Sequence, residues 1–123
     1  MRNAIIVLFL ILFSFNLYSQ EIYDVVRKDN GWTEIKLDNN QRKSGWTGNG
    51  EFEWDFSNSI IVIRKENGWT EVYDSNLSKI SSGWTGDKDF SKFKVVKSNI
   101  VLRKNDGFTI RYNQKLTKVF SGY

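Results

Sequence analysis

The residues best suited to contact a ligand are aromatic side chains that recur at fixed places along the chain. Trp46-Thr47 and Trp84-Thr85 each lie in a Ser-Gly-Trp-Thr-Gly segment, and a shortened Ser-Gly-Tyr segment ends at Tyr123. The flat faces of Trp and Tyr stack on the apolar CH faces of sugars, while neighbouring polar groups bind sugar hydroxyls. We therefore predict that all five residues contact a glycan. The alternative is that the rings pack in the core.

Residue types that catalysis often needs are missing. The sequence contains neither His nor Cys, which excludes Ser-His-Asp triads, thiol nucleophiles and Cys/His zinc sites. A glycosidase needs two carboxyl groups beside one cleft, and the acids that recur in similar segments are Glu34 and Glu71. Both face arginines in the predicted strand pairing, which would keep them ionised. We predict a protein that is not an enzyme and uses no cofactor and no metal; a small glycosidase is the less favoured alternative.

Three short acidic segments have oxygen atoms that would suit calcium. They are residues 38–40, 74–76 and 87–89, with the sequences Asp-Asn-Asn, Asp-Ser-Asn and Asp-Lys-Asp. None has the length or acidic density of an EF-hand loop. Asp and Asn also cap tight turns through hydrogen bonds from side chain to backbone. We favour this structural role for all three segments.

One segment occurs three times, at residues 25–35, 62–72 and 101–111, with its glycines 37 and 39 residues apart. Asn-Gly or Asp-Gly between β-branched and aromatic runs is the strongest short-range signal for a β-hairpin. We predict structural turns at Asn30-Gly31, Asn67-Gly68 and Asp106-Gly107. We expect the aromatic residues that follow these glycines to pack in the core: Trp32, Trp69 and Phe108.

A two-residue type I′ turn at each of these sites would fix the register of the strands. Arg27 would then lie opposite Glu34, and Arg64 opposite Glu71. Each pair would form a cross-strand ion pair worth a few tenths of a kcal/mol to about 1 kcal/mol at an exposed site.

A third strand follows each hairpin, and residues 51–58 and 90–97 have the period-2 pattern of linker strands between the copies. The predicted fold is therefore all-β, with three tandem antiparallel β-meander repeats of about 38 residues. The repeats span about residues 22–48, 60–86 and 99–123.

The segment IVIRKENGWTEVYDSNLSKISSGWTG, at residues 61–86, resembles one blade of a β-propeller, particularly of the NHL and YVTN types. The resemblance extends over all three repeats and implies a blade-like fold. Propellers need at least about four blades to close, so it further implies a ring shared between chains, as in small propeller-forming lectins. The alternative is a pseudo-threefold β-barrel or β-trefoil.

The first residues have the pattern of a secretory signal peptide. A short basic start precedes an uncharged, mostly apolar run at residues 4–17. A helix that spans a membrane needs about 20 such residues, so this run is too short. We expect cleavage near Ser19, with removal of residues 1–19. Residues 20–123 would then form a single β-repeat domain that is periplasmic or secreted and has no stable membrane anchor.

The charges of the chain match an ordinary solvated surface, because its 18 basic and 14 acidic residues are interleaved. Export makes nucleic acid an unsuitable partner. We therefore predict an exported, non-catalytic binding module for a glycan or another extracellular polymer. The alternative is a structural or adhesion subunit whose repeats pair with other copies of the chain in a homo-oligomer.

The export hypothesis makes a prediction about the N-terminus of the mature protein. In its native host, the protein should be recovered with an N-terminus close to Gln20, because the apolar run is too short to remain as an anchor. Intact-mass spectrometry of the purified protein measures this directly. Recovery of the full-length chain in the membrane fraction would contradict the hypothesis.

Overall fold

The computed structural model describes residues 20–48, 51–65, 67–86 and 90–123, so the predicted signal peptide lies outside it. The described residues form an all-β fold of three antiparallel sheets. They include no helix that is long and apolar enough to cross a membrane. The predicted fold class, a set of blade-like antiparallel meanders, is confirmed.

Each sheet is a meander in which strands that are consecutive in the chain are neighbours. Sheet 1 contains β1 (Ile22–Arg27), β2 (Trp32–Leu37) and β3 (Arg42–Trp46). Sheet 2 contains β4 (Glu51–Phe56), β5 (Ile61–Lys65), β6 (Trp69–Tyr73) and β7 (Lys79–Trp84). Sheet 3 contains β8 (Phe90–Val96), β9 (Asn99–Lys104), β10 (Thr109–Tyr112) and β11 (Lys118–Gly122). The two segments expected to be linker strands thus form β4 and β8, the first strands of sheets 2 and 3.

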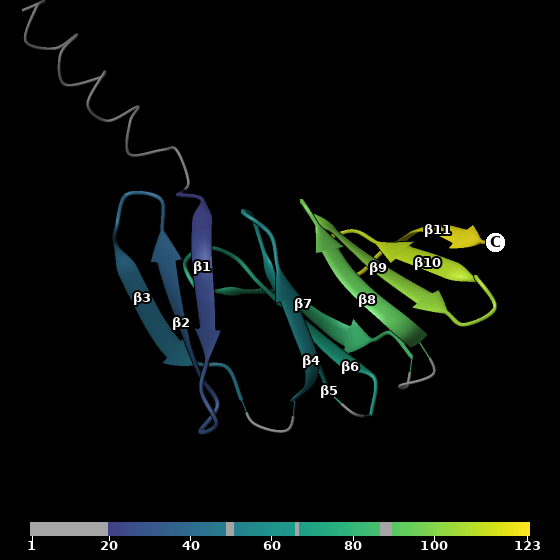
Figure 1. Cartoon of the computed structure of the whole chain (residues 1–123), viewed down its shortest axis with the longest axis horizontal. Helices are drawn as coiled ribbons and strands as arrows, with labels where there is room; N and C mark the ends of the chain where they lie inside the picture. The colour runs from purple at the N-terminus through teal and green to yellow at the C-terminus, as the bar shows by residue number, and fades with distance from the viewer. Residues whose placement is uncertain (1–19, 49–50, 66, 87–89) are drawn as a thin grey trace, which may run out of the picture.

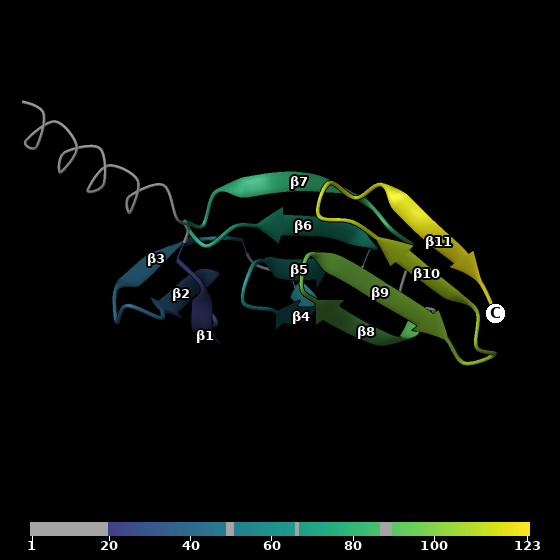
Figure 2. The same ribbon diagram turned by 90° about the horizontal axis from the view of Figure 1, so that it is seen from above.

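The three sheets follow one another in chain order, with sheet 2 between the other two (Figures 1 and 2). Strands β4 and β8 lie side by side where sheets 2 and 3 meet. Three separate sheets packed in this way correspond to the blade-like prediction rather than to a single threefold barrel.

Sheet 2 buries both of its faces. Ile61 and Ile63 pack in a cluster with Ile35 of sheet 1, whereas Val62 packs with Ile100 of sheet 3. Because side chains alternate between the two faces of a strand, the consecutive apolar residues of β5 serve two interfaces. Full burial of one such side chain contributes about 1.5–3 kcal/mol. These interfaces supply stability that a chain without cysteine cannot obtain from disulfides.

We call the face of each sheet that carries Trp32, Trp69 or Phe108 its front face, and the opposite face its back face. The front of sheet 2 packs against the back of sheet 1, and the front of sheet 3 packs against the back of sheet 2. Within the described residues, the front of sheet 1 and the back of sheet 3 are therefore the two outer faces of the stack.

The three hairpins turn at the expected glycines, but the type of turn differs from the prediction. Gly31, Gly68 and Gly107 have φ angles of 87°, 87° and 93°, whereas Asn30 and Asn67 do not adopt positive φ. Each glycine amide donates a hydrogen bond of 2.9–3.1 Å to the carbonyl oxygen three residues earlier. This is a three-residue type I turn that ends in a G1-bulge glycine.

The additional turn residue shifts the register of each hairpin by one position. Arg27 lies opposite Thr33, and Arg64 lies opposite Thr70. A shift by one residue moves every side chain of a strand to the other face. The predicted cross-strand ion pairs are therefore wrong, namely Arg27 with Glu34 and Arg64 with Glu71.

The turn glycines differ in how much space surrounds them. A Cβ atom at Gly68 would lie 2.1 Å from the carbonyl oxygen of Gly86, but at Gly107 the nearest atom would be Nη2 of Arg103 at 3.8 Å. Gly107→Ala should therefore lower the free energy of unfolding by about 1–2 kcal/mol, through strain at positive φ alone. Gly68→Ala should lower it by more than about 3 kcal/mol, because the backbone must also move.

Gly83→Ala is the matched control for this comparison. Gly83 does not have a positive φ, and its added Cβ would make an ordinary 3.5 Å contact with Leu116. The Gly83→Ala substitution should change the free energy of unfolding of the protein by less than about 1 kcal/mol. Urea denaturation of the three variants measures the differences. Equal losses for Gly68→Ala and Gly107→Ala would show that Gly86 does not limit the turn.

Candidate functional site

An aromatic pair stands at the turn end of each sheet, on the front face. The aromatic pairs are Trp32 with Trp46, Trp69 with Trp84, and Phe108 with Tyr123. The second members are the most open, with exposed fractions of 62%, 64% and 87% in chain order. The alternative that these three rings pack in the core is therefore wrong.

The first members of the aromatic pairs are less exposed than the second. Trp32 is 42% exposed and Trp69 is 39% exposed, so the expectation that both pack in the core is also wrong. Phe108 is half-buried, and the centre of its ring lies 5.3 Å from that of Tyr123 in an edge-to-face arrangement. Aromatic partners prefer this geometry over a face-to-face sandwich.

Hydrogen bonds to the hairpin turns hold the exposed rings in place. The Nε1 group of Trp46 donates to the carbonyl oxygen of Asn30 at 3.2 Å. The Nε1 group of Trp84 donates to the carbonyl oxygen of Asn67 at 2.8 Å. Each indole thus lies beside the hairpin turn of its own sheet. The rings are consequently fixed in orientation while most of their surface faces solvent.

In sheet 3, the hairpin turn holds the aromatic pair through a side-chain carboxylate rather than through a backbone carbonyl. The hydroxyl of Tyr123 donates to the Asp106 carboxylate at 3.3 Å. The other carboxylate oxygen of Asp106 accepts the Phe108 amide at 3.0 Å. Both oxygens of this turn residue are therefore used inside the protein, which distinguishes this pair from the two Trp pairs.

Thr47 and Thr85 are buried rather than available to a ligand, with exposed fractions of 5% and 4%. Thr47 lies 2.7 Å from the hydroxyl of Thr33, and Thr85 lies 2.6 Å from that of Thr70. The expectation that Thr47 and Thr85 contact a glycan is therefore wrong. Their backbone amides donate to the carbonyl oxygens of the turn glycines at 2.8 and 2.9 Å, which ties the end of the third strand to the hairpin.

Two of the repeated arginines, Arg27 and Arg64, support this end of sheets 1 and 2 from the back face. Arg27 donates to the hydroxyl of Thr33 at 2.6 Å and also to Thr47. Arg64 is 1% exposed, forms an ion pair with Glu53 and donates to the carbonyl oxygen of Gly86 at 2.9 Å. Sequence reasoning missed this role. The signal in the sequence was that an Arg and a Thr recur at the same positions in each copy. These two residues lie opposite each other across the hairpin only in the observed register.

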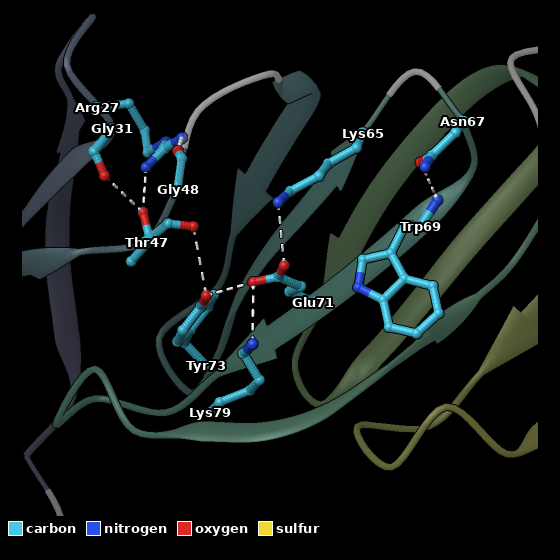
Figure 3. A network of polar contacts seen from close by, with 10 residues as sticks. All are labelled: Arg27, Gly31, Thr47, Gly48, Lys65, Asn67, Trp69, Glu71, Tyr73 and Lys79. Atoms are coloured by element: carbon cyan, nitrogen blue, oxygen red, sulfur yellow. Dashed lines mark hydrogen bonds and ion pairs between the residues drawn. The ribbon is translucent and has the colours of Figure 1, made fainter.

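A second polar cluster lies between sheets 1 and 2 (Figure 3). The Glu71 carboxylate accepts a hydrogen bond from the Tyr73 hydroxyl at 2.5 Å and lies 3.3 Å from Lys65 and 3.4 Å from Lys79. The Tyr73 hydroxyl also lies 3.5 Å from the carbonyl oxygen of Thr47. The cluster therefore connects the front of sheet 2 to the end of β3.

These contacts keep Glu71 charged. Burial alone would raise its pKa, but hydrogen bonds from Tyr73 and Lys65 and the charges of Lys65 and Lys79 outweigh burial, so that the pKa is lowered. Burial and the neighbouring carboxylate raise the pKa of Tyr73.

The pKa of Glu34 is also lowered, chiefly by a hydrogen bond from Lys28 and by the charge of that residue, whose ammonium group lies 2.9 Å from the carboxylate. A carboxyl group that donates a proton in catalysis needs a raised pKa instead.

Two of the acidic segments considered for calcium form turn caps. One Asp74 carboxylate oxygen accepts the amides of Asn76 and Ser78 at 2.8 and 3.0 Å. The Asn39 side chain accepts the amide of Gln41 at 3.0 Å. Residues 87–89 lie outside the described part of the chain. Among the described residues, no group of three or more His, Cys, Asp or Glu is placed to hold a metal ion.

An open hollow of about 320 Å³ lies on the front face of sheet 1. Tyr23, Val26, Glu34 and Arg42 are among the residues that line it. Tyr23 is 69% exposed, and the ammonium group of Lys36 lies 5.2 Å from the centre of its ring. The hollow thus joins apolar surface to charges of both signs, and it is separate from the aromatic pairs.

Glu71 should make the stability of the protein depend on pH. Because its pKa is lower in the folded state, its contribution is present above the ordinary value of 4.5 and is lost as the pH falls through the folded-state pKa. From about pH 5 to about pH 3, Glu71→Gln should therefore lose less free energy of unfolding than the unmodified protein. Tyr73→Phe, which removes one hydrogen bond to the carboxylate, should lie between them. An unchanged pH dependence in Glu71→Gln would contradict this assignment.

The comparisons with known proteins show a likeness of fold. No family model matches the sequence, and no curated protein matches it. The structure is similar to the crystal structure of HIRA(644-1017), with a TM-score of 0.55 and 9% sequence identity. The similar region covers 74% of this chain and 30% of that chain. The blade-like sheets are therefore compatible with a propeller-like repeat.

Proposed function

We propose that the protein is an exported, non-catalytic binding module that takes up glycans on its aromatic pairs. The observation that carries the proposal is the state of Trp46 and Trp84. Both rings are more than 60% exposed, yet each is anchored to a turn carbonyl through its N–H group. A ring that is already fixed loses little conformational freedom when a ligand stacks on it.

The groups around the rings suit sugars in particular. A sugar ring offers apolar CH groups on its faces and hydroxyl groups around its edge. The side chains of Asn30 and Asn67 are exposed in the turns beside the indoles. Their oxygens accept the amides of Trp32 and Trp69 at 3.2 and 3.0 Å. The side-chain NH₂ groups of the same two asparagines can donate hydrogen bonds to the hydroxyl oxygens of a sugar.

The repeat supports binding to a polymer rather than to a single sugar. One stacking contact is weak, with aromatic pairs worth about 0.5–1.5 kcal/mol beyond their buried area. Aromatic pairs on three packed sheets present several such contacts to the same chain of sugars. Linked weak contacts raise the overall affinity because each later contact is intramolecular.

The proposal is tested by removing one exposed ring at a time. Trp46→Ala and Trp84→Ala should each weaken binding to a neutral polysaccharide about 3- to 10-fold, which corresponds to the stacking energy above. Affinity electrophoresis in gels that contain soluble xylan, glucan or mannan measures the change. Each variant should keep its melting temperature within about 8 °C, because an exposed ring contributes little burial.

Tyr23→Ala is the matched control, since Tyr23 is 69% exposed but does not belong to an aromatic pair. It should leave polysaccharide binding unchanged. Equal binding by all three variants would refute the role of the aromatic pairs. A fall of many degrees in the melting temperature of Trp84→Ala would show that the ring is structural.

A further inference from the structure

We propose that the back face of sheet 3 binds an anionic polysaccharide through four cationic side chains, the basic quartet: Lys92, Lys94, Arg103 and Arg111. All four are exposed. The opposite face of the same strands is buried against sheet 2. The basic quartet is separate from the aromatic pairs, which lie on the front faces, and the inference does not depend on them.

The register places the basic quartet in two adjacent rows across the sheet. Lys92 lies directly opposite Arg103 on the neighbouring strand. In the next row, Lys94 and Arg111 lie on either side of Val101. With strands about 4.8 Å apart and alternate residues about 7 Å apart, the four positions lie within roughly 12 Å of one another.

Like charges in such positions repel one another. Cations directly opposite each other on adjacent strands destabilise a sheet. The ion pairs among the described residues involve other cations, namely Lys28, Arg64, Lys65 and Lys79. An anionic ligand across both rows would therefore relieve a repulsion that the described part of the fold leaves uncompensated.

Two of the four corresponding positions in sheet 2 carry the opposite charge. Glu53 lies opposite Arg64 and forms an ion pair with it, as Lys92 lies opposite Arg103 in sheet 3. Asp55 occupies the place of Lys94 and accepts the amide of Val95 at 2.7 Å. Two acids that serve the interface between sheets 2 and 3 are thus replaced by two lysines at the outer face. In the same way, Val72, which is buried in sheet 2, is replaced by Arg111.

A need for solubility does not explain this pattern. The other outer face, the front of sheet 1, carries both signs of charge: Asp24, Glu34, Lys36 and Arg42. Mixed charges are sufficient to keep an outer face solvated. The back of sheet 3 instead has four positive charges at neighbouring positions, which create a local positive field.

The residues around the basic quartet favour a polysaccharide over other polyanions. Phe120 lies opposite Arg111 on β11 and is 49% exposed. A guanidinium group forms paired hydrogen bonds with a carboxylate or sulfate, and a neighbouring aromatic ring stacks on a sugar face. A sugar polymer with one acidic group on each unit presents both features in alternation.

The test uses the mature protein and polygalacturonate as the probe, with dextran as the neutral polymer. Binding to polygalacturonate should be measurable by affinity electrophoresis at about 50 mM salt and should weaken strongly at about 300 mM salt. The double variant Lys94→Gln/Arg111→Gln should weaken it at least tenfold. The double variant Lys36→Gln/Arg42→Gln, which removes the same charge from the front of sheet 1, should change it less than twofold.

Further measurements separate this inference from the proposed function. Lys94→Gln/Arg111→Gln should leave binding to the neutral xylan, glucan or mannan unchanged. Failure of the unmodified protein to bind any neutral polysaccharide would count against the aromatic pairs only. The inference is overturned if polygalacturonate does not bind at low salt, or if the two double variants weaken it equally. Tighter binding to duplex DNA or to phosphatidylserine vesicles would also overturn it, because the partner would then be a nucleic acid or a membrane.

Discussion

Three glycines at positive φ set the geometry on which the sheets depend. A G1-bulge glycine adds one residue to the hairpin turn and increases the local twist of the strands. The carbonyl oxygens of Gly31 and Gly68 accept the amides of Thr47 and Thr85, so that the end of the third strand is tied to the turn. The Trp residue before each Thr is thereby held beside the turn. One backbone conformation thus fixes the register, the closure of the meander and the place of the exposed ring.

The register also determines where the repeated arginine lies. A buried charge is strongly unfavourable unless it is paired and hydrogen-bonded. Arg64 meets this requirement with Glu53 and the carbonyl oxygen of Gly86, and its guanidinium lies 5.8 Å from the centre of the Phe93 ring. A slip in the pairing of β4 with β5 would remove Glu53 while the charge stayed buried. The ion pair therefore favours one register within sheet 2, whose other interior contacts are mostly apolar and less directional.

The fold class could be predicted from the sequence because turn residues and period-2 patterns are local signals. The register could not, because Asn-Gly suits both a two-residue type I′ turn and a type I turn with a G1-bulge glycine. That single ambiguity changed the partner of Arg64 from Glu71 to Thr70. The exposure of Trp69 could not be predicted from the sequence either, because it depends on how much of sheet 2 its neighbour covers. Sheet 1 covers the apolar residues on the front face of sheet 2 but not the turn end of that face.

The turns between the last two strands of each sheet distinguish sheets 2 and 3, which have another sheet in front of them, from sheet 1. Leu77 and Leu116 both have a φ of 60°, a conformation that costs a residue with a Cβ about 1–2 kcal/mol. Each leucine packs against the sheet in front of its own, beside Gly45 and Gly83 respectively.

Sheet 1 has Asn40 at the corresponding place, with a φ of 67° and an exposed side chain. Asparagine tolerates this conformation better than leucine. A strained leucine is thus used where a neighbouring sheet compensates its cost by burying it. A tolerant asparagine is used where the described chain places no sheet in front, so the copies diverge according to what each face contacts.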